Sequence, residues 1–345
     1  MMKMNKWTMA LAAAGVVSLS SVAQAQEAAA GADALAASTT LSGYVSTSYT
    51  MSDTGGGNLG KTNEDADKFK LDVVSLTLSS AQGAGEYATG YTVGMWIGPD
   101  DQNTQAAGGS DFELTQANID LRLPVGNGLD LKVGQFGTVV GYETFEYDSN
   151  AFFQRGLAFN EEPTHHTGVL ASYQVSDSLN VHVGLVNNSA NNITNDETGA
   201  GGGNTMLAAV DYTVGDSAGV LGGTSIYAAT IQDLSEADYW YLQVGLPVPV
   251  EGLSLDVAAD WVDADNGNDD EIYQVYAAYT LSDKATLNAR YEFGTADSGS
   301  LTDLESVAVG VTYDLWDNVT SRVEYMSTSE EGSTDDDTLA FNLVY

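Results

Sequence analysis

The chain has 345 residues, no cysteine, and a formal net charge of −37 that comes from 48 acidic against 11 basic residues. Phosphate binding needs clustered Lys and Arg, so this balance argues against a nucleic-acid partner and favours cations as the counterpart. Without cysteine the protein has no disulfides, and its length allows one large β domain or two ordinary ones.

Residues 1–25 are typical of a secretory signal peptide. Lys3 and Lys6 precede an apolar run that ends in Ala23-Gln24-Ala25, which is the order of a positive region, an apolar core and a small-residue cleavage site. The run is shorter than the about 20 apolar residues of a membrane-spanning helix. We therefore expect an exported protein, cleaved after Ala25. Cleavage removes two lysines and no acid, so the formal net charge changes from −37 to −39.

From Leu41 onward, apolar and polar residues alternate in repeated segments. The segment 285–294 is the clearest, because Leu287, Tyr291 and Phe293 alternate with polar neighbours. Such a period of two predicts β-strands with one apolar and one polar face. The predicted strands lie near 41–50, 68–80, 87–98, 112–123, 128–137, 166–175, 178–187, 205–215, 223–233, 238–248, 252–262, 271–281, 285–294, 303–314, 318–328 and 336–345. A phase slip between Val73 and Val74 predicts a β-bulge.

The predicted connections alternate between short turns and long loops, except that the link 234–237 is short where a long one is expected. Strands of about ten residues with short turns on one side and long loops on the other are typical of an outer-membrane barrel. The alternative is a soluble β-sandwich. It fits less well, because these strands exceed the usual length of about five or six residues and their polar faces carry charges suited to a wet lumen.

The predicted fold is therefore all-β: a transmembrane antiparallel β-barrel of about 16 strands whose third long loop folds inward. The predicted order along the chain is signal peptide 1–25, Ala-rich tail 26–40 and barrel 41–345, with a constriction loop at 138–165. The expected location is the outer membrane of a Gram-negative type cell, in contact with membrane lipid and lipopolysaccharide.

The last strand carries an apolar stripe formed by Phe341, Leu343 and the terminal Tyr345. A barrel closes by pairing its last strand with its first, which leaves no open edge. The stripe then faces lipid, and Tyr345 belongs to the aromatic girdle at the membrane interface. We also expect these three residues to act as a C-terminal signal for the outer-membrane assembly machinery.

The segment 131–188 resembles the β-barrel porin-2 family, the OmpL-like porins. The resemblance is carried by Val133-Gly134-Gln135-Phe136, by Gly141-Tyr142-Glu143, by Asn150, Phe152, Phe153 and Arg155, and by Pro163-Thr164-His165-His166-Thr167-Gly168. The last element has one histidine more than the family pattern, so no role is assigned to a single histidine. The resemblance implies a porin fold and transport without naming the solute, and it makes a homotrimer one option for the assembly.

The loop 138–165 is far longer than an ordinary connection, which indicates a functional loop or disorder. Its many aromatic residues favour packing against the inner barrel wall. The loop carries the acids Glu143, Glu146, Asp148, Glu161 and Glu162, and inward positions of the wall carry the bases Arg122, Lys132, Arg290 and Arg322. Acids that face bases across a narrow opening order water and penalise apolar solutes.

These charges have a second interpretation, as ion pairs that only stiffen the barrel, in particular Arg290 with Glu292 and Arg322 with Glu324. Arg155 is expected to anchor the loop to the wall. With acids in excess overall, the sequence predicts an outer-membrane porin for passive diffusion of small hydrophilic solutes and ions, with cation preference.

Three alternatives stay open at this point. A substrate-selective channel, for example for oligosaccharides, needs a line of aromatic side chains in the lumen. A closed barrel acting as an adhesin or structural surface protein needs a loop that plugs the lumen. A barrel enzyme needs a catalytic triad, and three histidines without suitably spaced partners predict neither a triad nor a metal site. No catalytic residue, cofactor or metal is therefore expected.

Overall fold

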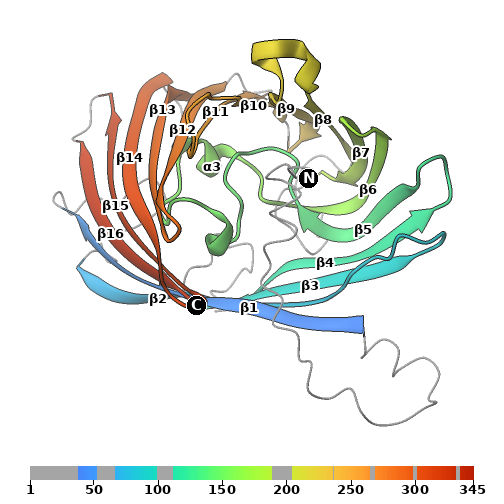
Figure 1. Ribbon diagram of the computed structural model, residues 1–345, viewed down its shortest axis with the longest axis horizontal. Coiled ribbons are helices and arrows are strands. Elements are labelled where there is room, and N and C mark those ends of the chain that lie inside the picture. Colours follow the sequence, from blue (N-terminus) through green and yellow to red (C-terminus); the bar gives the residue numbers. More distant parts are fainter. Residues whose placement is uncertain are drawn as a thin grey trace, which may run out of the picture.

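The computed structural model describes residues 38–52, 67–98, 112–188, 204–235, 237–264, 269–297, 301–331 and 335–345. These residues form a closed barrel of antiparallel strands, each paired with its neighbours in the chain, and β1 paired with β16 (Figure 1). The strands are β1 (Thr39–Ser52), β2 (Lys68–Ser80), β3 (Thr89–Ile97), β4 (Phe112–Leu123), β5 (Leu129–Gly137), β6 (His165–Ser176), β7 (Leu179–Asn187), β8 (Asn204–Thr213), β9 (Ser225–Leu234), β10 (Ala237–Leu246), β11 (Leu253–Ala264), β12 (Asp270–Ser282), β13 (Ala285–Asp297), β14 (Leu301–Trp316), β15 (Val319–Glu330) and β16 (Asp336–Val344). The predicted fold class is confirmed.

The alternation along each strand separates two environments. In β13, Leu287, Tyr291 and Phe293 are exposed on the outer face, whereas Arg290 and Glu292 are buried inside. An apolar outer face suits the hydrocarbon core of a bilayer, and closure of the sheet satisfies every strand's backbone groups. Among the described residues, no helix is long and apolar enough to cross a membrane.

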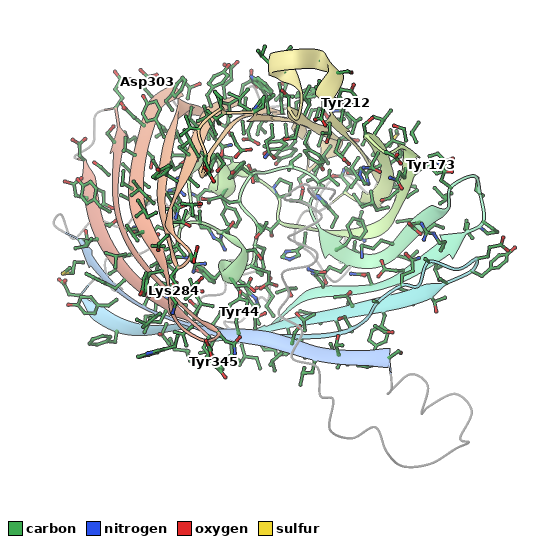
Figure 2. All side chains as sticks on the ribbon, viewed as in Figure 1. Tyr44, Tyr173, Tyr212, Lys284, Asp303 and Tyr345 are labelled. Carbon is green, nitrogen blue, oxygen red and sulfur yellow. The ribbon has the colours of Figure 1, made fainter. Side chains whose placement is uncertain are left out.

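The barrel closes through the C-terminal strand, as the sequence predicts. Tyr49 lies opposite Phe341 in the pairing of β1 with β16. Val45 and Tyr345 exchange both backbone hydrogen bonds, at 2.9 and 3.0 Å. Figure 2 shows Tyr345 on the outer side of the wall and Tyr44 on the inner side. The pairing is thus confirmed, while the role of Phe341, Leu343 and Tyr345 in assembly stays a prediction.

The predicted bulge in β2 lies one residue earlier than expected. Ser46 pairs with Val73 but Thr47 pairs with Leu71, so Asp72 is the extra residue. Asp72 is fully buried. Its carboxylate accepts hydrogen bonds from the hydroxyls of Ser46 at 2.8 Å and Ser48 at 2.6 Å. The buried carboxylate of Asp72 therefore links β2 to β1, the strand that closes the barrel with β16.

Two further differences concern the connections. β1 begins at Thr39, inside the predicted tail, whereas residues 1–37, including the predicted signal peptide, lie outside the described residues. The connection 214–224 between β8 and β9 contains the 3-10 helix η3 (Asp216–Leu221), so it is longer than the other turns on its side of the barrel.

We expect Ser48→Ala to destabilise the folded barrel by about 1–3 kcal/mol, because the buried carboxylate of Asp72 loses a hydrogen-bond donor. Guanidinium unfolding followed by intrinsic fluorescence measures the change. Ser42→Ala is the matched control, since Ser42 lies on the same strand but is only half-buried. Equal stabilities of the two variants would contradict a structural role for the Asp72 cluster.

Candidate pore constriction

Residues 138–164, between β5 and β6, lie inside the barrel. They contain the 3-10 helix η2 (Tyr147–Ser149) and the short helix α3 (Leu157–Glu161). Figure 1 shows this loop within the ring of strands, with α3 nearest the β11–β13 side. The inward fold of the third long loop is therefore confirmed.

Aromatic and aliphatic side chains hold the loop against the wall on several sides. Trp96 of β3 stacks on Phe145 and Tyr147, with ring centroids 4.0 and 5.5 Å apart. At the start of the loop, Val139 and Val140 pack in an apolar cluster with wall residues of β7 to β11. The apolar residues of the loop thus have a wall to pack against, as their density in the sequence indicates.

Two wall carboxylates accept consecutive backbone amides of the loop. Glu324 of β15 accepts the N–H groups of Phe153 at 2.7 Å and Gln154 at 2.6 Å. Glu292 of β13 accepts the N–H groups of Leu157 at 2.9 Å and Ala158 at 3.4 Å. Because backbone donors inside a protein need acceptors, these two glutamates fix the middle of the loop to the wall.

Arg290 lies between the wall and the loop. Its guanidinium contacts Glu143 of the loop at 2.5 Å, Glu292 of its own strand at 3.1 Å and the Gln154 carbonyl at 3.0 Å. It also lies over the ring of Phe152, 5.1 Å from the centroid. The Arg290 side chain is fully buried. Glu143 and Arg290 are therefore in direct contact, whereas the sequence predicts that they face each other across a narrow opening.

Glu146 of the loop and Arg322 of the wall also form hydrogen bonds between the loop and the wall. Glu146 accepts hydrogen bonds from the Tyr44 hydroxyl at 2.7 Å, the Trp96 indole at 2.9 Å and the Ser75 hydroxyl at 3.3 Å. Burial raises the pKa of Glu146 above its ordinary value. Arg322 donates to the Asn150 carbonyl of the loop at 3.0 Å. Its expected partner Glu324 instead accepts loop amides.

Arg155 holds the loop to itself. Its guanidinium donates to the Phe145 carbonyl at 2.5 Å and lies over the rings of Tyr147 and Phe159, 4.7 and 4.5 Å from their centroids. These partners are all loop residues. The sequence predicts that Arg155 anchors the loop to the wall, but Arg290 and Arg322 make those contacts instead.

The remaining loop acids differ in exposure. Asp148 is exposed, while Glu161 and Glu162 are partly buried. Burial raises the pKa of Glu161. Burial, and the neighbouring carboxyl of Asp260 to which Glu162 is hydrogen-bonded, raise the pKa of Glu162 well above its ordinary value. Two carboxyl groups in contact share a proton more readily than they both ionise.

The four predicted wall bases fall into two groups. Arg290 and Arg322 are buried under the loop. Lys132 instead pairs with Asp120 at 2.7 Å, and Arg122 pairs with Asp130 at 3.1 Å, with side chains 21–36% exposed. Both pairs connect β4 with β5. Because their side chains are partly exposed, this part of the wall is accessible to water.

A third partly exposed pair lies further along the same side of the wall. His182 of β7 contacts Asp211 of β8 at 3.2 Å, with both side chains 25% exposed, and its other ring nitrogen lies 2.8 Å from the Ser172 hydroxyl. The sequence alone does not identify Asp120, Asp130 or Asp211, which pair with Lys132, Arg122 and His182. In the described part of the chain, no group of three or more His, Cys, Asp or Glu residues could hold a metal ion.

A closed barrel with its third long loop folded inside defines the class of outer-membrane porins. Residues 38–342 match the family model described as "Putative beta-barrel porin-2, OmpL-like", so the chain belongs to this family. The match extends the resemblance carried by residues 131–188 to nearly the whole barrel. Among curated proteins, no significant match is found.

Solved structures show the same fold at low sequence identity. The outer membrane channel DcaP of Acinetobacter baumannii has a TM-score of 0.63 at 15% identity, with 90% of this chain and 97% of that chain covered. A loop L8 deletion mutant of OmpT of Vibrio cholerae has 0.62 at 14%, covering 89% and 99%. An anion-selective porin from Comamonas acidovorans has 0.59 at 13%, covering 89% and 99%.

We expect Glu324→Ala to loosen the loop, because two backbone donors lose their acceptor at about 1–3 kcal/mol each. The chain has no cysteine, so Ala158→Cys, at a fully buried small residue, supplies a single reporter. Its labelling by a small maleimide should be faster when Glu324→Ala is added. Glu305→Ala, at an exposed glutamate of β14, is the matched control and should leave the rate unchanged. Equal labelling rates with Glu324→Ala and with Glu305→Ala would contradict the role of Glu324 in fixing the loop to the wall.

Glu162→Gln should change how stability depends on pH. Because the pKa of Glu162 is raised in the folded barrel, its stabilising contribution is complete below the unfolded pKa of about 4.3 and is lost as pH rises through the folded value. The variant should therefore match the wild type at pH 4 and exceed it in unfolding midpoint at pH 8. Glu251→Gln, at an exposed turn residue, should show neither effect. A wild-type advantage at pH 8 would contradict the assignment.

Proposed function

We propose that the protein is an outer-membrane porin through which small hydrophilic solutes and cations diffuse passively, between the loop 138–164 and the wall formed by β4 to β8. The observation that carries the proposal is the contrast in exposure around the wall. Charged pairs on β4–β5 and β7–β8 are partly exposed, whereas the charged residues of β13 and β15 are buried under the loop.

The exposed pairs account for selection of polar solutes. Ions and hydroxylated solutes can exchange water for contacts with Lys132, Asp120 and the neighbouring pairs, and apolar solutes cannot. These pairs contain three acids, Asp120, Asp130 and Asp211, but only two permanently charged bases, Arg122 and Lys132. This local excess of acid, together with the formal net charge of −37, supports cation preference.

The loop acids then have two different roles. Glu143 and Glu146 are committed to contacts that position the loop, so they set the width of the passage more than its charge. Asp148 is the exposed loop acid and is the candidate for contact with passing cations. Arg290 and Arg322 likewise belong to the attachment of the loop, and Arg122 and Lys132 belong to the passage.

The fold alone does not decide the sign of the selectivity, because a porin of the same fold is anion-selective. Contact with lipopolysaccharide, delivery by the assembly machinery and association as a homotrimer remain part of this proposal. The outer apolar face and the C-terminal stripe support the first two. A closed barrel acting as an adhesin or structural surface protein is the alternative that an absence of conductance would favour.

The first test is the single-channel current of the refolded protein in a planar bilayer under a KCl gradient. Steady conductance with a reversal potential that favours K⁺ is the expected result. No conductance from protein shown to be folded by heat-modifiable gel migration would mean that the loop closes the lumen, and the diffusion proposal would be given up.

Removing the exposed base should strengthen the cation preference. In Lys132→Ala the carboxylate of Asp120 loses its partner, so the reversal potential should move further toward the K⁺ equilibrium potential. Lys284→Ala is the control, because Lys284 lies in the exposed turn 283–284 between β12 and β13 (labelled in Figure 2). An equal shift in both variants would place the selectivity outside the β4–β8 wall.

A further inference from the structure

A recess of about 220 Å³ lies between the loop and β11–β13. Its wall residues Ser254, Ala278 and Asn288 are close to the strand ends that are joined by the short turns 247–252 and 283–284. The recess therefore lies on the short-turn side of the constriction. Its volume corresponds to about seven water molecules, which is room for one small solute.

One side of the recess is aromatic. Tyr142 of the loop stacks on Tyr276 of β12, with ring centroids 3.7 Å apart and planes inclined by 14°. Phe152 adds a further ring. Both tyrosines are positioned by hydrogen bonds, from Tyr142 to Asp256 at 3.3 Å and from Tyr276 to the Gln274 side-chain oxygen at 2.8 Å. The rings thus form a fixed apolar surface.

The other side of the recess is polar, and one group there has unused hydrogen-bonding capacity. Asn288 of β13 is 4% exposed. Its amide nitrogen donates to the Thr312 hydroxyl at 3.0 Å. Among the residues that the structure describes, its amide oxygen has no hydrogen-bond partner, and it is not fully enclosed, so water or a solute in the recess can reach it. Because Asn288 lines the recess, a bound solute can supply the missing donor.

The polar groups around Asn288 include both donors and acceptors. The Tyr142 hydroxyl donates to Asp256 and the Ser254 hydroxyl to the Ala278 carbonyl, so both can still accept. The Asn288 amide offers one donor and one acceptor, and the Asp256 carboxylate accepts. An ammonium group would match only the acceptors. A carboxylate solute would match only the donors and would face Asp256 and Glu143. Hydroxyl groups donate and accept at once, so they match the whole set.

We infer that this recess is a binding subsite for a neutral polyhydroxylated solute of monosaccharide size, with the sugar's apolar face against the tyrosine pair and its hydroxyls toward Asn288 and Asp256. A mostly apolar concave surface with a few convergent polar groups is the usual composition of a small-molecule site. The inference rests on the proposed function, since it names a solute class for that channel. It also provides the lumen aromatics that a sugar-selective channel requires.

Ligand-observed NMR with glucose tests the inference on folded protein in a detergent without a sugar head group. We expect saturable glucose binding that Asn288→Ala weakens about tenfold, the equivalent of one lost hydrogen bond. Asn180→Ala is the matched control, because Asn180 is a polar strand residue of β7, outside the recess, and binding should be unchanged. Choline and succinate serve as small cationic and anionic probes.

Binding and conduction are measured separately, so the two proposals can fail independently. A barrel that conducts K⁺ but does not bind glucose, or binds it equally well in Asn288→Ala, overturns the subsite and leaves the porin proposal in place. Stronger binding of choline or succinate than of glucose overturns the assignment to sugars. Glucose binding by a barrel without conductance supports the subsite and overturns passive diffusion.

Discussion

The structure depends on a single constraint, which is that a long loop inside a barrel must find acceptors for its backbone N–H groups. Residues 153, 154, 157 and 158 find them in Glu324 and Glu292, and residue 156 finds one in Glu143 at 2.8 Å. An unmatched donor at such a position costs about 1–3 kcal/mol. Carboxylates solve this problem well because each has two oxygens, and consecutive amides can use both.

The use of carboxylates as acceptors creates a second requirement. Several negative charges in a buried cluster are unfavourable unless a cation or a proton accompanies them. Arg290 forms ion pairs with Glu143 and Glu292. Glu162, beside Asp260, has a raised pKa and so keeps its proton to higher pH than a free glutamate does. A chain with so few bases therefore commits two of its arginines, Arg290 and Arg322, to the attachment of the loop.

Much of this arrangement could be predicted from the sequence, because it follows from local periodicity. The alternation of Leu287, Tyr291 and Phe293 with polar residues places Arg290 and Glu292 on one face, and their contact is observed. The length and aromatic content of the loop indicate its inward fold. The apolar stripe at the C-terminus requires a first strand to pair with, and β1 supplies it.

The partners of the loop could not be predicted in the same way. Phe153 and Glu324 are 171 positions apart in the sequence, and Glu143 and Arg290 are 147 apart. No short-range pattern relates them, since their contact depends on the closed barrel and on the path of the loop. The pairing of Lys132 with Asp120 is different, because it spans one short turn. The turn length sets the register of the β4–β5 hairpin, and that register places Lys132 opposite Asp120.

The division of the charged residues separates two properties of the channel. Side chains on β13 and β15 hold the loop and so determine how much of the lumen it fills, while the partly exposed pairs on β4–β5 and β7–β8 meet the solute. A substitution in the second set can alter charge without moving the loop, because the two sets share no ion pair among the residues described. Porins of one fold can then differ in selectivity, since function resides in a few side chains of the site rather than in the barrel.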